Sequence, residues 1–202
     1  MSLLVEKHRH SIQDYYRIEN DATEKHEFRD GEILAMSGGS PAHAKIAMNV
    51  AAVMWQRLKG KPCQPYGSDL RVRITARQRT AYPDVSVICG PIQLDPDDPS
   101  GHTVLNPRVI AEVLSPSTEA YDRGNKFAAY REIPSLSEYV LVSQSEPRVE
   151  TFLRQPDGTW SLASHTGIDA VAKVRAVDVD LPLSEVFAGV EFPSEPPAQP
   201  VA

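Results

Sequence analysis

Residues 108–143, RVIAEVLSPSTEAYDRGNKFAAYREIPSLSEYVLVS, are the stretch that decides the fold. They open with a nearly continuous apolar run that contains one acid, Glu112, a pattern typical of a central strand covered on both faces. Residues 119–132 predict a helix that ends before Pro134, and residues 138–143 predict another strand. A strand, a helix and a strand in succession indicate a sheet with helices packed against it.

The segments on either side extend this sheet. Residues 82–89, YPDVSVIC, form a second apolar run with a single acid, and residues 68–74 predict a further strand. Residues 41–58 predict a long helix, because Pro suits the first helical turn and apolar residues recur at helical spacing. Residues 26–37 predict a hairpin that turns at Asp30-Gly31. The order of elements predicts one α/β (α+β) domain, a mixed β-sheet flanked by helices.

Length and charge limit the domain organisation and the class of protein. The chain has 202 residues, which suits a single domain, predicted over residues 1–190, followed by a Pro-rich disordered tail over 191–202. The net charge of −6 argues against a non-enzymatic protein that coats nucleic acid by bulk charge. A local site that reaches nucleic acid through a metal remains compatible with this charge.

The cellular compartment is predicted from what the sequence lacks. No stretch approaches the roughly 18–20 apolar residues of a membrane span, so we expect no membrane association. The opening residues, MSLLVEKHRHS, carry Lys and His where a secretory signal has its apolar run. Cys63 and Cys89 are too few for a disulfide framework and are expected to be free thiols. A reduced, cytoplasmic protein is therefore predicted.

Two carboxylates in apolar strands are the first candidates for chemistry. Asp84 lies in the run 82–89 and Glu112 in the run 108–114. A buried carboxylate is costly unless it is paired or binds a metal. Each one alone could instead mark a strand end and accept from a helix N-terminus or an arginine. Together, on neighbouring strands, they would repel each other unless a cation lay between them, and oxygen ligands favour Mg²⁺ or Mn²⁺.

Lys126 is the third candidate. Asp122, Lys126 and Tyr130 are spaced i, i+4 and i+8 on the predicted helix, so they share one face. This face could carry only a surface Asp–Lys pair. It could also lie over the end of the Glu112 strand, where the ammonium would position an attacking water and stabilise its hydroxide form. The spacing leaves both interpretations open.

These residues resemble a known family. The run from Ala111 to Ser143 is similar to the Uma-two family of predicted restriction endonucleases, which shows a carboxylate strand ending in Leu-Ser-Pro-Ser-Thr and a helix with Asp, Arg, Lys and Tyr at these spacings. Further matches are HEFRDGEILAMS, SPAH, YPDVSVI and LPLSEVF, so the resemblance covers about residues 10–190. The resemblance implies the restriction-endonuclease-like fold of the PD-(D/E)XK nuclease superfamily.

The resemblance also implies a catalytic set. Asp84 would be the acid of the PD element and Glu112 the second acid. Leu114 stands where the superfamily pattern has its lysine, so Lys126 would take over from the adjacent helix. Glu27, in the first hairpin, matches an acidic position that can join the metal shell.

The implied activity is that of an endonuclease that hydrolyses the phosphodiester bonds of DNA with a metal-activated water. Asp84 and Glu112, with the carbonyl of Val113, would hold Mg²⁺, for which Mn²⁺ could substitute. Enzymes that cut duplexes often pair so that each subunit cuts one strand, so a homodimer is expected. The alternative is a nucleic-acid-binding module that keeps the fold and has weak catalysis or none.

Several other residues are weaker candidates. His43, Asp122 and Ser115 are expected to support the site, although His43 fits a capping or packing role equally well. A serine hydrolase built on Ser115 or Ser117 is disfavoured, because no glycine elbow surrounds either serine. Four arginines between two predicted strands form the best local basic patch, with phosphate contact and simple solubility as equal alternatives; they are Arg71, Arg73, Arg77 and Arg79.

Overall fold

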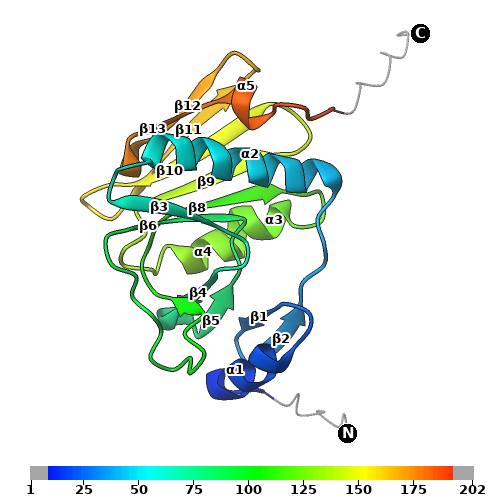
Figure 1. The fold of residues 1–202 in the computed structure, drawn as a ribbon, viewed down its shortest axis with the longest axis vertical. Helices are drawn as coiled ribbons and strands as arrows, with labels where there is room; N and C mark the ends of the chain where they lie inside the picture. Colours follow the sequence, from blue (N-terminus) through cyan, green and yellow to red (C-terminus); the bar gives the residue numbers. More distant parts are fainter. Residues whose placement is uncertain (1–8, 193–202) are drawn as a thin grey trace, which may run out of the picture.

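A six-stranded mixed sheet forms the centre of the protein (Figure 1), in the order β11-β10-β9-β8-β6-β3. The computed structural model describes residues 9–192. Most of the tail predicted over 191–202 lies outside the described residues, as does the start of the predicted domain. The strands are β3 Cys63–Gly67, β6 Val85–Cys89, β8 Pro107–Leu114, β9 Glu138–Ser143, β10 Arg148–Arg154 and β11 Trp160–Thr166.

The strands β8 and β9 are parallel, and the other neighbours in this sheet are antiparallel. A parallel pair needs a crossover connection, and here a helical segment supplies it. The segment consists of α3 Glu119–Tyr121, a π-helical turn η2 Asp122–Lys126 and α4 Phe127–Tyr130. The strand, helix and strand predicted from residues 108–143 are thus confirmed, with a π turn in place of a regular α-helix.

Alternation along β8 decides what each face of the sheet meets. Val109, Ala111 and Val113 belong to the core packed under helix α2 Pro41–Leu58. Ile110 and Leu114 belong to the opposite core, with Phe127 and Tyr130 of the crossover helix among its members. Because side chains in a strand alternate, Glu112 lies on the face of the crossover helix.

A second, smaller sheet has the order β2-β1-β5-β4-β7 and lies with helix α1 at the lower end of the molecule in Figure 1. Its bounds are β1 His26–Arg29, β2 Glu32–Ala35, β4 Arg71–Ile74, β5 Arg79–Ala81 and β7 Thr103–Val104; α1 spans Ile12–Asp21 and a 3₁₀ turn η1 spans Thr75–Arg77. The predicted hairpin turn is confirmed, because Asp30 and Gly31 have φ of 53° and 90°.

The last two strands of the described residues form a β12–β13 hairpin, which packs against α2. It consists of β12 Val171–Val174, the 3₁₀ turn η3 Arg175–Val177 and β13 Val179–Pro182, followed by α5 Leu183–Val186. In the part of the chain that the structure describes, no helix is both long and apolar enough to cross a membrane.

The prediction that the two cysteines are free thiols is wrong. Cys63 and Cys89 form a disulfide and are not free thiols. They are directly opposite each other in the antiparallel pairing of β3 with β6. The sequence did not indicate β3, an edge strand that contains Pro65 and forms by pairing with a strand about twenty residues away, so the proximity of the two thiols could not be foreseen.

Candidate active site

A cleft of about 460 Å³ gathers acidic and basic side chains from separate elements. Glu27 comes from β1, His43 from the first turn of α2, and Asp84 from the residue before β6. Glu112 comes from β8 and Lys126 from the π turn of the crossover helix. The parallel crossover after β8 brings the helix back over its strand, which places Lys126 above Glu112.

Lys126 is surrounded by carboxylates. Its Nζ lies 2.7 Å from Oε1 of Glu112, 3.4 Å from Oδ1 of Asp122 and 3.8 Å from Oε1 of Glu27. The residue is 9% exposed and Glu112 is 4% exposed, so the main ion pair is largely removed from water. A surface Asp–Lys pair, the simpler interpretation of this spacing, is therefore excluded.

The π-helical turn lies at the point where the helix meets the site. A π turn adds a residue to the helical repeat, and such turns are frequent at functional sites. Asp122 and Lys126 are the first and last residues of this turn, and both side chains reach the cleft. Four residues on, the hydroxyl of Tyr130 donates to Oε1 of Glu112 at 2.8 Å. The same carboxylate oxygen thus contacts both Lys126 and Tyr130.

Asp84 is held against the neighbouring strand β8. The N–H of Val113 donates to Oδ2 of Asp84 at 2.7 Å, and the N–H of Asp84 makes a longer contact of 3.4 Å to Oε2 of Glu112. The N–H and C=O of one strand residue point to the same side. The carbonyl of Val113 therefore faces the cleft beside the two carboxylates.

Burial and neighbouring charges shift the pKa values in opposite senses. Burial raises the pKa of Glu112 to about 8, with Asp84 adding to the shift and Lys126 opposing it. Burial would by itself lower the pKa of Lys126, but attraction from Glu112, Glu27 and Asp122 outweighs it and raises that pKa. A hydrogen bond to Asp84, whose Oδ2 lies 3.3 Å from Nε2 of His43, raises the pKa of His43.

The oxygen atoms of the cleft could bind a divalent cation whose remaining ligands are waters and substrate phosphate. Among the described residues, four acidic side chains line the cleft with two permanent cations, Arg29 and Lys126, so acidic groups outnumber fixed positive charges. Among residues 9–192, no group of three or more His, Cys, Asp or Glu residues is arranged to hold a metal ion alone. Mg²⁺ is usually bound through one or two carboxylates, with waters and substrate phosphates completing its shell. Asp84, Glu112 and the carbonyl of Val113 match this mode.

The supporting residues predicted from the sequence also line this cleft. They are His43, Asp122 and Ser115. Ser115 has a local role, because its hydroxyl accepts from the N–H of Thr118 at 3.2 Å and contacts the hydroxyls of Ser117 and Thr118. This hydrogen bonding shapes the turn into the crossover helix.

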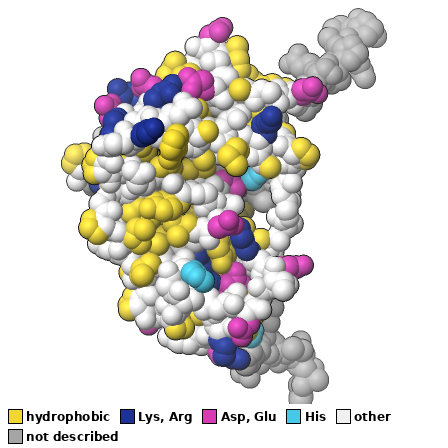
Figure 2. Space-filling model, in the orientation of Figure 1, with side chains coloured by type: hydrophobic (Ala, Val, Ile, Leu, Met, Phe, Trp, Pro, Cys, Tyr) yellow, Lys and Arg dark blue, Asp and Glu magenta, His cyan; other side chains and the backbone are white. Residues whose placement is uncertain are grey.

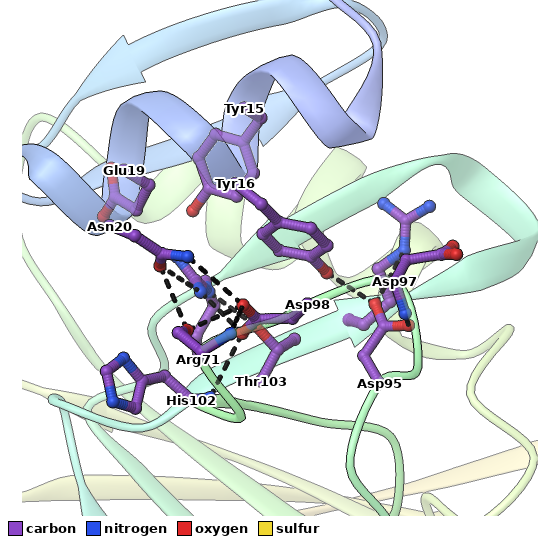
Figure 3. A network of polar contacts seen from close by, with 12 residues as sticks. Tyr15, Tyr16, Glu19, Asn20, Arg71, Asp95, Asp97, Asp98, His102 and Thr103 are labelled. Carbon is purple, nitrogen blue, oxygen red and sulfur yellow. Dashed lines mark hydrogen bonds and ion pairs between the residues drawn. The ribbon is translucent and has the colours of Figure 1, made fainter.

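The predicted basic patch is wrong for two of its four arginines, Arg71 and Arg73, which are buried, and stays a prediction for Arg77 and Arg79. Arg71 and Arg73 are 1% and 3% exposed, with Arg71 paired to Asp98 at 2.8 Å and Arg73 lying 3.6 Å from Asp95. Figure 3 shows Arg71 enclosed by Asn20, Asp98 and Thr103. Arg77 pairs with Glu132 and Arg79 with Asp30. On the face drawn in Figure 2, Lys and Arg side chains are interspersed with Asp and Glu.

Two cleft residues did not emerge from the sequence. Arg29 lines the cleft and its guanidinium lies over the ring of Tyr121, 3.9 Å from the ring centroid. Arg29 stands two residues after Glu27 on β1, so strand alternation could have placed both side chains on one face. The contact with Tyr121 depends on the docking of the crossover helix and carries no local signal.

Comparisons with known proteins agree with this architecture. The Uma2 family model, described as "Putative restriction endonuclease", matches residues 12–185. The chain is 35% identical over 182 residues to "Uncharacterized protein slr1290" of Synechocystis, covering 90% of this chain and 93% of that protein. A second Synechocystis protein, "Uncharacterized protein sll1609", is 36% identical over 157 residues, covering 78% of this chain and 88% of that protein.

A solved structure shows the same fold. It is the crystal structure of "a putative nuclease belonging to DUF820" from Anabaena variabilis, with a TM-score of 0.70 and 16% identity, covering 88% of this chain and 97% of that chain. The predicted fold class, a mixed sheet flanked by helices in one domain, is thus confirmed, and by the extent of the family match this chain belongs to the Uma2 family of restriction-endonuclease-like proteins.

Proposed function

We propose that this protein is a metal-dependent endonuclease that hydrolyses phosphodiester bonds of DNA. The observation that carries the proposal is the convergence of Asp84, Glu112 and Lys126 in one cleft, although they come from three different elements. Such a combination of two carboxylates and a lysine suits hydrolysis of an anionic ester, because it can hold a hard cation and stabilise negative charge. Membership of the Uma2 family supports the same reaction class.

Asp84, Glu112 and the carbonyl of Val113 would hold Mg²⁺ or Mn²⁺. When bound, the cation would lower the pKa of a coordinated water and offset the charge of the scissile phosphate. The protein prepares these ligands. The N–H of Val113 fixes one oxygen of Asp84, while Lys126 and Tyr130 fix Oε1 of Glu112 and orient its Oε2 toward Asp84.

Lys126 would supply the fixed positive charge of the site. The surrounding carboxylates raise the pKa of its ammonium, so it would act as a hydrogen-bond donor to the developing negative charge and not as a base. A preorganised donor of this kind contributes about 3–4 kcal/mol to transition-state stabilisation. Glu27, 3.8 Å from the ammonium, would orient the attacking water or bind a second cation.

Calorimetry with Mn²⁺ tests the site without any assumption about the substrate. We expect saturable binding to the wild type, no binding to Asp84→Ala, and wild-type binding to the control Asp157→Asn, whose carboxylate is exposed and accepts from Thr159. Wild-type binding unaffected by Asp84→Ala would contradict the ligand assignment.

Incubation with supercoiled plasmid, single-stranded DNA and RNA in Mg²⁺ or Mn²⁺ tests the reaction. Cleavage of DNA that requires Asp84 supports the proposal. Metal-dependent DNA binding with no cleavage would favour the alternative, a binding module on a nuclease fold. Enzymes that cut duplexes often pair so that each subunit cuts one strand, and the expected homodimer stays a prediction that light scattering tests. Cell fractionation tests the predicted cytoplasmic location.

A further inference from the structure

Arg29 lies in the candidate active site with hydrogen-bonding capacity that the protein does not use. Its side chain lines the cleft together with Lys126 and is 31% exposed. Lys126 is engaged by three carboxylates. Among the described residues, Arg29 makes a single ion pair, a long contact of 3.4 Å from Nη2 to Oε2 of Glu27. Within residues 9–192, nothing accepts a hydrogen bond from its buried Nε.

The position of the guanidinium is nevertheless well defined. Its central carbon lies 3.9 Å from the centroid of the Tyr121 ring, and β1 is held by β2 on one side and β5 on the other. Stacking on an aromatic ring occupies the face of a guanidinium and leaves the N–H groups along its edge to donate in parallel to two oxygens of one acceptor. Phosphate is such an acceptor.

The charges in the cleft favour Arg29 as the first residue to contact an anionic substrate. The carboxylates that line it would repel a phosphodiester, and Lys126 is buried among them. Of the described residues that line the cleft, Arg29 is the other permanent cation and is more exposed than Lys126, so it can contact a substrate before the substrate reaches the carboxylates.

We propose that Arg29, stacked on Tyr121, is the residue that binds a backbone phosphate of the substrate in this cleft. This assignment rests on the proposed nuclease function. Glu27 lies two residues earlier on the same face of β1. Glu27 would then act near the attacking water, and Arg29 would bind the backbone phosphate.

The test compares Arg29→Met with Arg29→Lys and with the matched control Arg57→Met. Arg57 is 37% exposed and paired with Glu185. It follows His43 by 14 residues on α2, which places it about 21 Å farther along the helix axis. The first probe is thymidine 3′,5′-bisphosphate, titrated by calorimetry in saturating Mn²⁺. We expect Arg29→Met to weaken binding about 10- to 100-fold, Arg29→Lys to weaken it less, and Arg57→Met to leave it unchanged.

The salt dependence of DNA binding separates a direct contact from a structural role. Loss of one phosphate contact should reduce the slope of log K against log salt concentration by about 0.9 for duplex DNA, a change that altered packing would not produce. We expect this reduction in Arg29→Met and not in Arg29→Lys. Tyr121→Leu removes the aromatic support and should weaken binding of the bisphosphate with Arg29 still present, so the assignment remains testable if Arg29→Met unfolds.

The outcomes distinguish this assignment from the proposed function. Equal binding of the bisphosphate by Arg29→Met and the wild type, or no binding by the wild type, overturns the role of Arg29. If the wild type also cleaves DNA, the nuclease proposal survives that result. Arg29-dependent binding in a protein that cleaves neither DNA nor RNA supports the phosphate contact and overturns the nuclease function.

Discussion

Nζ of Lys126 lies 2.7 Å from Oε1 of Glu112, although the lysine follows the glutamate by 14 residues and belongs to the π turn of the crossover helix. Leu114, two residues after Glu112, shares its strand face but is 3% exposed and belongs to the apolar core. The strand position that would carry a lysine in the superfamily pattern therefore packs the core. The helix supplies the cation instead.

Replacement of Lys126 by Met should affect both activity and stability. Three carboxylates lose their cation, so we expect the free energy of unfolding to fall by about 3–5 kcal/mol and DNA cleavage to fall about 10²- to 10³-fold. Denaturant unfolding and plasmid cleavage measure the two effects. The double variant Glu112→Gln, Lys126→Met should regain stability and remain inactive. Undiminished cleavage by folded Lys126→Met would show that the lysine assignment is wrong.

The buried ion pair between Arg71 and Asp98 should contribute strongly to the free energy of unfolding (Figure 3). Asp98 accepts from Arg71, Thr103 and the backbone of His102, which attaches the loop before β7 to β4. Arg71→Met leaves a buried carboxylate without its cation and should cost about 3–5 kcal/mol. In a double-mutant cycle by denaturant unfolding, Arg71→Met with Asp98→Asn should cost less than the sum of the single variants. Additive effects would show that the pair is not coupled.

Glu138 should make stability depend on pH. Burial raises the pKa of Glu138 to about 7, although a hydrogen bond from the N–H of Ala176 partly offsets the rise. No group within the described residues donates a hydrogen bond to its Oε1. The unfolded side chain titrates near 4.5, so between pH 4.5 and 7 the folded state retains a proton that the unfolded state releases. The unfolding free energy therefore falls as pH rises through this window, by an amount on the order of 3 kcal/mol.

The variant Glu138→Gln isolates this contribution, because its side chain stays neutral at every pH. Thermal unfolding at several pH values should show a flatter profile for the variant, with its advantage over the wild type growing from pH 4.5 to 7. Parallel profiles for the two proteins would mean that Glu138 does not titrate in this range.

Reduction of the Cys63–Cys89 disulfide should destabilise the fold without changing the cleft. The bond closes a loop with a sequence separation of 26 residues, and a loop of this length corresponds to about 3.5 kcal/mol of unfolded-state entropy. Denaturant unfolding with and without reductant measures the difference, and Cys63→Ala with Cys89→Ala should behave like the reduced wild type. Titration of two reactive thiols in the unreduced, denatured protein would contradict the disulfide.

Local pattern was sufficient for many of the elements. The apolar spacing and Pro41 predicted α2 with its observed bounds, and Asp30-Gly31 predicted the β1–β2 turn. The strands β3, β5, β7, β12 and β13 escaped prediction. Each is short and lacks a marked alternation of apolar residues, so its pairing with a partner strand, and not its own pattern, accounts for its backbone hydrogen bonds.

The sequence by itself singled out Asp84 and Glu112 as candidates, because an acid in an apolar strand is costly unless it has a partner. Lys126 became a candidate through its helical spacing and the family resemblance, and the spacing alone also fitted a surface pair. Only the tertiary structure decided how they meet and which other charges are available. The crossover after β8 and the π turn bring Lys126 onto Glu112, and the docking of the same helix places Tyr121 under Arg29. The arginines Arg71 and Arg73 look exposed in a polar run, yet the packing of α1 and the loop before β7 buries them against aspartates. Charge pairing of this kind depends on distances between segments that are far apart in the chain, and folding alone sets those distances.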